Sequence, residues 1–188
     1  MLKNRKRSEK QFTQGIVRHL RRELGAVYEI GTGAKANLLY KLIIVPGITI
    51  KPEKWGKPAR AQYAFQTDVL ITRKRDHTPL VVIEIKFGGF STHDVLTYSS
   101  KALKHKEIYP YLRYGFMVGD QKQLDWKFFT HNTGFDFALA IGSGYTSRQK
   151  DLLTAMIKNQ IKIAKRLTEI VQKNRELVKS YETTIEFE

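Results

Sequence analysis

Residues 66–72 (Gln-Thr-Asp-Val-Leu-Ile-Thr), the polar segment 73–79 and residues 80–86 (Leu-Val-Val-Ile-Glu-Ile-Lys) decide how this sequence folds. Two apolar, β-branched runs flank a basic segment that ends in proline, which is typical of a β-hairpin with a longer loop. Each run is long enough for one strand of a sheet. The sequence therefore predicts a central pair of antiparallel strands.

Three ionisable residues interrupt the apolar pattern of this hairpin: Asp68, Glu84 and Lys86. Because side chains alternate along a strand, Glu84 and Lys86 share one face of the sheet. A turn centred near Asp76 places Asp68 opposite Glu84, with Cβ atoms roughly 5 Å apart. Two like charges in that position destabilise a sheet, and a bound divalent cation would remove the cost. The alternative is a surface hairpin in which Lys86 neutralises both carboxylates.

Composition limits the class of protein. The chain has 188 residues, of which 41% are hydrophobic and 27% charged, which is typical of one globular domain. Its net charge of +15 favours a polyanionic partner, most often nucleic acid, over an ordinary solvated basic surface. There are no cysteines, so disulfides and cysteine-based zinc sites are excluded. No apolar run could span a bilayer, so we expect a cytoplasmic protein without a membrane partner.

The order of the expected elements predicts the fold class. Helices are expected over residues 9–24 and 92–107, and strands over 26–30, 37–45, the hairpin, 113–119 and 135–141. Residues 1–7 are expected to form a basic arm, with Ser8 as the helix N-cap. This order implies an α/β fold in which helices flank a mixed central sheet.

The chain is expected to divide into a core over residues 1–146 and a long C-terminal helix in 147–188. From Ser147 to Tyr181 no glycine or proline interrupts the helical pattern. Its apolar seam follows the alternating spacing of a coiled coil, with Gln160 and Asn174 as register-setting polar residues. The seam residues are Leu153, Ile157, Gln160, Ala164, Leu167, Val171, Asn174, Val178 and Tyr181. We favour a dimerisation role for this helix over packing on its own core.

Basic residues outside the hairpin are candidates for DNA contacts. Lys35 lies in a glycine loop over residues 31–36, and a longer basic loop surrounds Trp55. Tyr98 and Lys101, on the helix over 92–107, are expected next to the hairpin, and His93 and His105 on that helix's surface. The predicted DNA-contacting residues are Lys35, Lys51, Lys54, Lys57, Arg60, His93, Tyr98 and Lys101.

Paired carboxylates beside a lysine favour metal-dependent hydrolysis of phosphodiesters. Asp68 and Glu84 can hold one or two Mg²⁺ ions through hard oxygen ligands, with Mn²⁺ as a substitute. Lys86 can orient or activate the attacking water and stabilise negative charge. No Gly-x-x-x-x-Gly-Lys-Ser/Thr motif is present, so no nucleotide cofactor is expected.

The arrangement Asp68, hairpin, Glu84-Ile85-Lys86, helix and strand resembles the PD-(D/E)XK nuclease superfamily over residues 8–119. The family's motif residues map onto Asp68, Glu84 and Lys86, while Thr67 replaces its proline. The resemblance implies a restriction-endonuclease-like core and Mg²⁺-dependent cleavage that leaves 5′-phosphate ends. Many members carry an early helix glutamate as a further ligand, and Glu9 looks like that residue, ahead of Glu23 and Glu29.

Three functions fit this resemblance. The first, which we favour, is a homodimeric, sequence-specific endonuclease of restriction type that acts on double-stranded DNA. The second is a structure-specific nuclease for four-way junctions or DNA repair. The third is a non-catalytic DNA-binding module with the same fold. Base contacts come from loops, so the sequence does not reveal which DNA is recognised.

Overall fold

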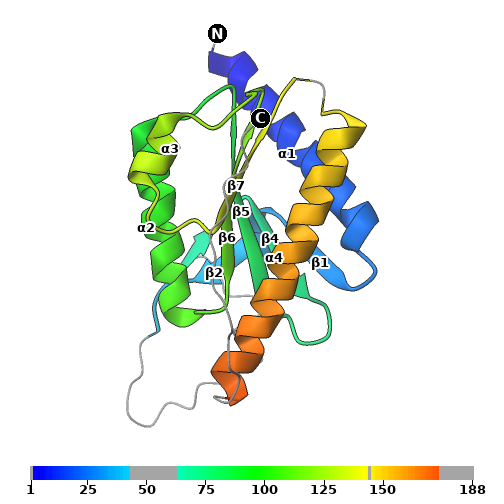
Figure 1. The fold of residues 1–188 in the computed structure, drawn as a ribbon, viewed down its shortest axis with the longest axis vertical. Helices are drawn as coiled ribbons and strands as arrows, with labels where there is room; N and C mark the ends of the chain where they lie inside the picture. The colour runs from blue at the N-terminus through cyan, green and yellow to red at the C-terminus, as the bar shows by residue number, and fades with distance from the viewer. Residues whose placement is uncertain (1, 43–62, 144, 174–188) are drawn as a thin grey trace.

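The computed structural model describes residues 2–42, 63–143 and 145–173. Its helices are α1 (Leu2–Leu24), the 3₁₀ helix η1 (Gly33–Ala36), α2 (Thr92–Ile108), α3 (Trp126–His131) and α4 (Ser147–Lys173). Its strands are β1 (Tyr28–Gly31), β2 (Asn37–Leu39), β3 (Ala64–Gln66), β4 (Val69–Arg73), β5 (Pro79–Phe87), β6 (Arg113–Gly119) and β7 (Phe137–Ile141). The main sheet stands between two layers of helices (Figure 1), so the predicted α/β class is confirmed.

The main sheet has the strand order β1-β4-β5-β6-β7, with β5 at its centre. β1, β4 and β5 pair antiparallel, whereas β6 and β7 continue parallel to β5. The parallel step from β5 to β6 needs a crossover, and α2 supplies it. The predicted hairpin is the β4–β5 pair, in which Val69 lies opposite Ile83. The expected mixed sheet flanked by helices is therefore present.

Two hydrophobic cores cover the two faces of this sheet. Ile83 and Ile85 of β5 belong to the core that α1 and α4 close with residues such as Leu20 and Leu153. Val82, one residue out of phase, belongs to the other core, which α2 and α3 close. Alternation along β5 therefore sends Glu84 and the side chains in phase with it toward α2.

The C-terminal helix packs on its own sheet. Leu153, Ile157 and Ala164 of α4, all part of the predicted seam, are fully buried in the core shared with α1 and β5. This part of the apolar face therefore has an intramolecular partner, as in the alternative of packing on its own core, and dimerisation stays a prediction. Val171 is exposed, and Asn174, Val178 and Tyr181 lie outside the described residues.

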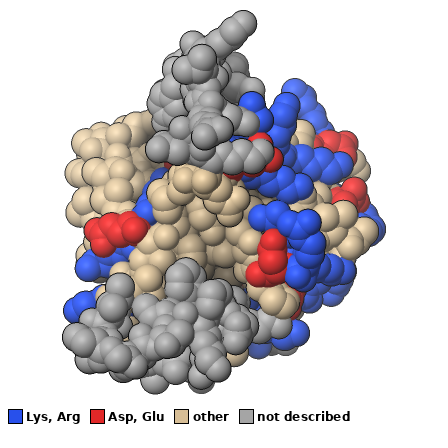
Figure 2. All heavy atoms as spheres, turned by 90° about the horizontal axis from the view of Figure 1, so that it is seen from below, with Lys and Arg blue, Asp and Glu red and all other residues tan. Residues whose placement is uncertain are grey.

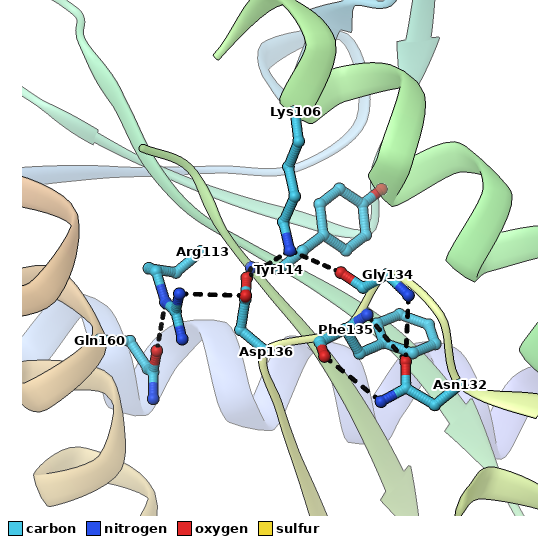
Figure 3. A network of polar contacts seen from close by, with 8 residues as sticks. All are labelled: Lys106, Arg113, Tyr114, Asn132, Gly134, Phe135, Asp136 and Gln160. Atoms are coloured by element: carbon cyan, nitrogen blue, oxygen red, sulfur yellow. Dashed lines mark hydrogen bonds and ion pairs between the residues drawn. The ribbon is translucent and has the colours of Figure 1, made fainter. Parts of the chain in front are cut away.

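A polar network ties α2, β6 and α4 to the segment before β7 (Figure 3). The Asp136 carboxylate accepts a hydrogen bond from the Tyr114 backbone N–H at 2.7 Å and pairs with Lys106 at 2.9 Å and Arg113 at 3.0 Å. Arg113 Nε donates to Gln160 Oε1 at 2.9 Å. Gln160 therefore serves this intramolecular network, and the network holds the start of β6 in place.

Several local predictions differ from the structure. α1 begins at Leu2, so Ser8 lies inside the helix and residues 2–7 are not an extended arm; no Pro or Gly in this segment interrupts the helix. The glycine loop forms the short helix η1, and β2 ends at Leu39. β3, which pairs with β2, and α3 were not expected. These short elements depend on partners distant in sequence, which local patterns do not specify.

Basic side chains gather on one side of the face drawn in Figure 2, the side on which α1, β1 and α4 lie in Figure 1. On α4, Lys158, Lys162 and Arg166 recur every four residues and are exposed, so they form one ridge along the helix. Among the described residues, no helix is long and apolar enough to cross a membrane.

Two glycines allow a test of the packing. Gly115 of β6 lies directly under the ring of Phe137 on β7, and a Cβ atom there would collide with that ring. We expect Gly115→Ala to lower the free energy of unfolding by about 1–3 kcal/mol. A Cβ at Gly15 of α1 would meet no atom within 4 Å, so Gly15→Ala should raise the free energy of unfolding by about 0.5–1 kcal/mol. Urea unfolding curves of both variants would check this, and an unchanged or stabilised Gly115→Ala protein would contradict the packing.

Candidate functional site

The candidate site lies where β4 begins and β5 runs toward its end. Asp68 directly precedes β4, and the register of Val69 with Ile83 places it next to Glu84 in the following pair. The Asp68 carboxylate accepts a hydrogen bond from the Ile85 backbone N–H at 2.7 Å, which fixes it against β5. The structure therefore brings the two predicted carboxylates together on neighbouring strands.

Glu84 is buried, with 1% of its surface exposed. Its Oε1 accepts a hydrogen bond from the Tyr114 hydroxyl at 2.6 Å and pairs with Lys101 Nζ at 2.7 Å. Lys101 Nζ also donates to the Gln66 backbone carbonyl at 2.6 Å. Within the described part of the chain, no donor is recorded on Oε2. One oxygen of the carboxylate is thus held in place by Tyr114 and Lys101.

Burial raises the pKa of Glu84, and the neighbouring Asp68 raises it further, while the Lys101 ammonium and the Tyr114 hydroxyl act in the opposite direction. The net direction is upward, so ionised Glu84 is energetically costly in the folded protein. A cation at this position lowers that cost, which is the electrostatic role that Lys101 fills in the structure.

Lys86 projects from the same strand toward the start of α2. Its Nζ pairs with Asp94 at 3.0 Å and lies 5.2 Å from the centre of the Tyr98 ring. Burial works against the charged form, but the hydrogen bond to Asp94 and the contact with Tyr98 outweigh it and raise the pKa of Lys86. Lys86 is therefore an ammonium ion at neutral pH, suited to stabilising negative charge.

The sequence after β5 explains how α2 reaches this site. Gly88 and Gly89 adopt positive φ and end the strand, after which Ser91 caps α2. Ser91 and Asp94 form a capping box, in which each side chain accepts a hydrogen bond from the other residue's backbone N–H. Asp94 thus starts the helix and also holds Lys86. The Tyr98 ring, one turn later, lies under Lys86 and within 5.7 Å of Lys101 Nζ.

Glu9 does not join the two carboxylates. It lies on α1, which packs on the sheet face opposite to the one that Glu84 shares with α2. Among the described residues, no three His, Cys, Asp or Glu side chains gather as a metal-binding group. Glu23 pairs with Arg22 at 2.9 Å, and Glu29 lies 3.7 Å from His77. A role for Glu9 as a third ligand stays a prediction.

The predicted DNA-contacting residues fall into three groups. Tyr98 and Lys101 lie at the site, as expected for neighbours of the hairpin. Lys35 is exposed on η1, and His93 is exposed in the first turn of α2. The loop residues Lys51, Lys54, Lys57 and Arg60 lie outside the described residues.

His105, expected on the helix surface, is wholly buried, which corrects that expectation. It bonds to the Leu38 carbonyl at 3.2 Å, and burial lowers its pKa to about 3. Its neutral ring is therefore part of the packing between α2 and β2.

Sequence reasoning missed two residues of the site, Tyr114 and Asp94. Tyr114 reaches Glu84 because β6 pairs parallel to β5 with Val82 opposite Tyr114, so that Tyr114 and Glu84 face the same side. This register is a long-range feature without a local signal. Asp94 carried a signal in the spacing Ser-x-x-Asp at a helix start, which is a capping pattern.

Searches of protein-family models, curated proteins and solved structures found no match to this chain.

The raised pKa of Glu84 predicts how the stability of the fold depends on pH. A carboxyl whose pKa is higher in the folded state stabilises the fold below its ordinary pKa of 4.5, and this contribution is lost as the pH rises through the folded-state value. Glu84→Gln keeps the hydrogen-bonding shape without the charge. At pH 8 we expect this variant to melt about 2 °C or more above the wild-type protein.

This difference should shrink as the pH falls toward 4.5, and thermal unfolding followed by circular dichroism at several pH values measures it. Glu107→Gln, on the exposed face of α2, is the matched control and should melt like the wild-type protein throughout. A Glu84→Gln protein that melts below the wild type at pH 8 would show that the ion pair with Lys101 outweighs the cost of burial.

Proposed function

We propose that this protein is a metal-dependent DNA endonuclease with a PD-(D/E)XK nuclease core. The observation that carries the proposal is the pairing of Asp68 with a buried Glu84 on neighbouring strands, with Lys86 two residues further along the same strand. An ordinary surface hairpin would leave Glu84 in water, whereas here its carboxylate is inside the protein and held by Tyr114 and Lys101.

The donor set fits Mg²⁺. Asp68 and Glu84 would supply hard carboxylate oxygens, and positive charge beside Glu84, as Lys101 provides, lowers the cost of its burial. When bound there, the ion would lower the pKa of a coordinated water and neutralise charge on the phosphate. Mn²⁺ has the same preference for oxygen ligands and can replace it.

The chain's own residues define the remaining roles. The Ile85 backbone N–H orients Asp68, and the Tyr114 hydroxyl orients Glu84, so both carboxylates are fixed before substrate arrives. Lys86, paired with Asp94, would stabilise negative charge on the scissile phosphate and orient the attacking water, and its raised pKa disfavours the role of a base.

The basic surface supports a nucleic-acid substrate. The net charge of +15 and the α4 ridge of Lys158, Lys162 and Arg166 attract a phosphate backbone without reading its sequence. A homodimeric restriction enzyme in the cytoplasm stays our first expectation for double-stranded DNA. Junction or repair cleavage is the second, and a non-catalytic DNA-binding module is the third.

Cleavage assays test the proposal directly. We expect the wild-type protein to cut plasmid DNA or a synthetic four-way junction in Mg²⁺ and to leave both intact in EDTA. Asp68→Ala, Glu84→Gln and Lys86→Ala should each slow cleavage by more than about 100-fold. Discrete plasmid fragments indicate the restriction type, and cleavage of the junction alone indicates a resolvase.

Two exposed residues provide matched controls for these variants: Glu107→Gln for the carboxylates and Lys122→Ala for the lysine. Both should cut at the wild-type rate. Full activity of Asp68→Ala would rule out this site, and salt-sensitive DNA binding without cleavage by the wild-type protein would indicate the non-catalytic module.

A further inference from the structure

A groove of about 640 Å³ opens beside the candidate site, between β3 and the outer side of α2. Lys101 and Tyr98 form part of its wall, and the same two residues contact Glu84 and Lys86. The groove and the paired carboxylates therefore share a boundary. A ligand in the groove would therefore contact Lys101 and Tyr98, at the edge of the candidate site.

The two walls of the groove differ in character. On the α2 side, His93, Thr97, Lys101 and Lys104 follow at intervals of four, four and three residues, so they form one stripe about 16 Å long. On the β3 side, Phe65 stacks on Tyr40 with ring centres 3.9 Å apart, so this wall is aromatic. Among the residues that the structure describes, no Asp or Glu lines the groove.

We propose that this groove binds unpaired nucleotides of a DNA strand next to the scissile phosphate. Apolar and aromatic side chains (Phe65, Leu96 and Tyr98) suit bases, and the exposed amine of Lys104 suits a phosphate, which is the combination that single-strand binding uses. The inference rests on the proposed nuclease function and names its substrate class as DNA with a single-stranded segment at the cleavage point. Among the proposed nucleases it therefore favours the structure-specific enzyme for junctions or repair over the restriction type.

The volume of the groove favours a single strand over a duplex. A groove of about 640 Å³ has the size of a small-molecule pocket, for which roughly 300–1,000 Å³ is usual. One or two nucleotides fit such a space, whereas a double helix is read along a much larger surface. The duplex part of a substrate would lie outside the groove, on the surface around it.

Two leucines on α2 give a matched test. Leu96 lines the groove and is 47% exposed, whereas Leu103, two turns later, is 44% exposed and is not part of the lining. Leu96→Glu and Leu103→Glu make the same change in charge on the same helix at similar exposure. Only the first introduces a negative charge into the proposed path of the strand.

The assay is fluorescence anisotropy of the full-length protein with a labelled dT₂₀ strand and with a 20-base-pair duplex, in EDTA so that no cleavage occurs. We expect the wild-type protein to prefer the single strand. Leu96→Glu should weaken single-strand binding by about tenfold, and Leu103→Glu by less than about twofold. Lys104→Ser against Lys122→Ser repeats the comparison with a milder change, and circular dichroism confirms that each variant is folded.

Equal losses in both members of each pair would overturn the groove assignment, as would tighter binding of the duplex than of dT₂₀. If a U₂₀ RNA binds more tightly than dT₂₀, and Leu96→Glu weakens that binding, the substrate class would not be DNA.

Cleavage is measured separately, with Mg²⁺, on a forked and a fully paired duplex, and Leu96→Glu should remove any preference for the fork. If the wild-type protein cuts neither DNA while the Leu96 and Leu103 variants still differ in binding, the groove is supported and the nuclease function fails alone. Retention of the fork preference by Leu96→Glu would overturn the groove.

Discussion

A carboxylate inside an apolar sheet is costly, and the arrangement around Glu84 answers that cost. Tyr114 comes from β6 and Lys101 from α2, so two elements distant in sequence converge on one buried side chain, whereas the neighbouring Asp68 adds to the cost of its charge. An uncompensated charge in this position would destabilise the domain by several kcal/mol. The contacts therefore tie the placement of α2 and the register of β6 to the chemistry of the site.

Asp136 connects the start of β6 to other parts of the domain. By binding the Tyr114 backbone N–H together with Lys106 and Arg113, it fixes where β6 begins, and through Gln160 it links that strand to α4. Asp136 binds the backbone of Tyr114 (Figure 3), and the hydroxyl of the same residue binds Glu84, so the network is connected to the site through Tyr114.

What could be predicted from the sequence follows from the range of each interaction. Alternating apolar residues in short runs predict strands, and this local pattern is enough to predict the hairpin and the mixed sheet. It also predicts that Asp68 and Glu84 are neighbours. The hydrogen bond from Tyr114 and the burial of the α4 seam on its own sheet depend on pairing and packing across the domain. The heptad-like pattern of α4 predicts only that Leu153 and Ile157 are buried. The sheet of the same chain can bury them as well as a second chain can.

The small β2–β3 sheet has a consequence for how this domain can vary. Tyr40 and Tyr63, at the two ends of the segment between these strands, are joined by a backbone hydrogen bond of 2.9 Å. Because the chain leaves and returns at the same point, a longer or shorter insert there costs little: each doubling of its length adds only about 0.6 kcal/mol of closure entropy. A change in the length of the chain between the two strands would therefore leave their pairing, and with it the positions of the carboxylates, unchanged.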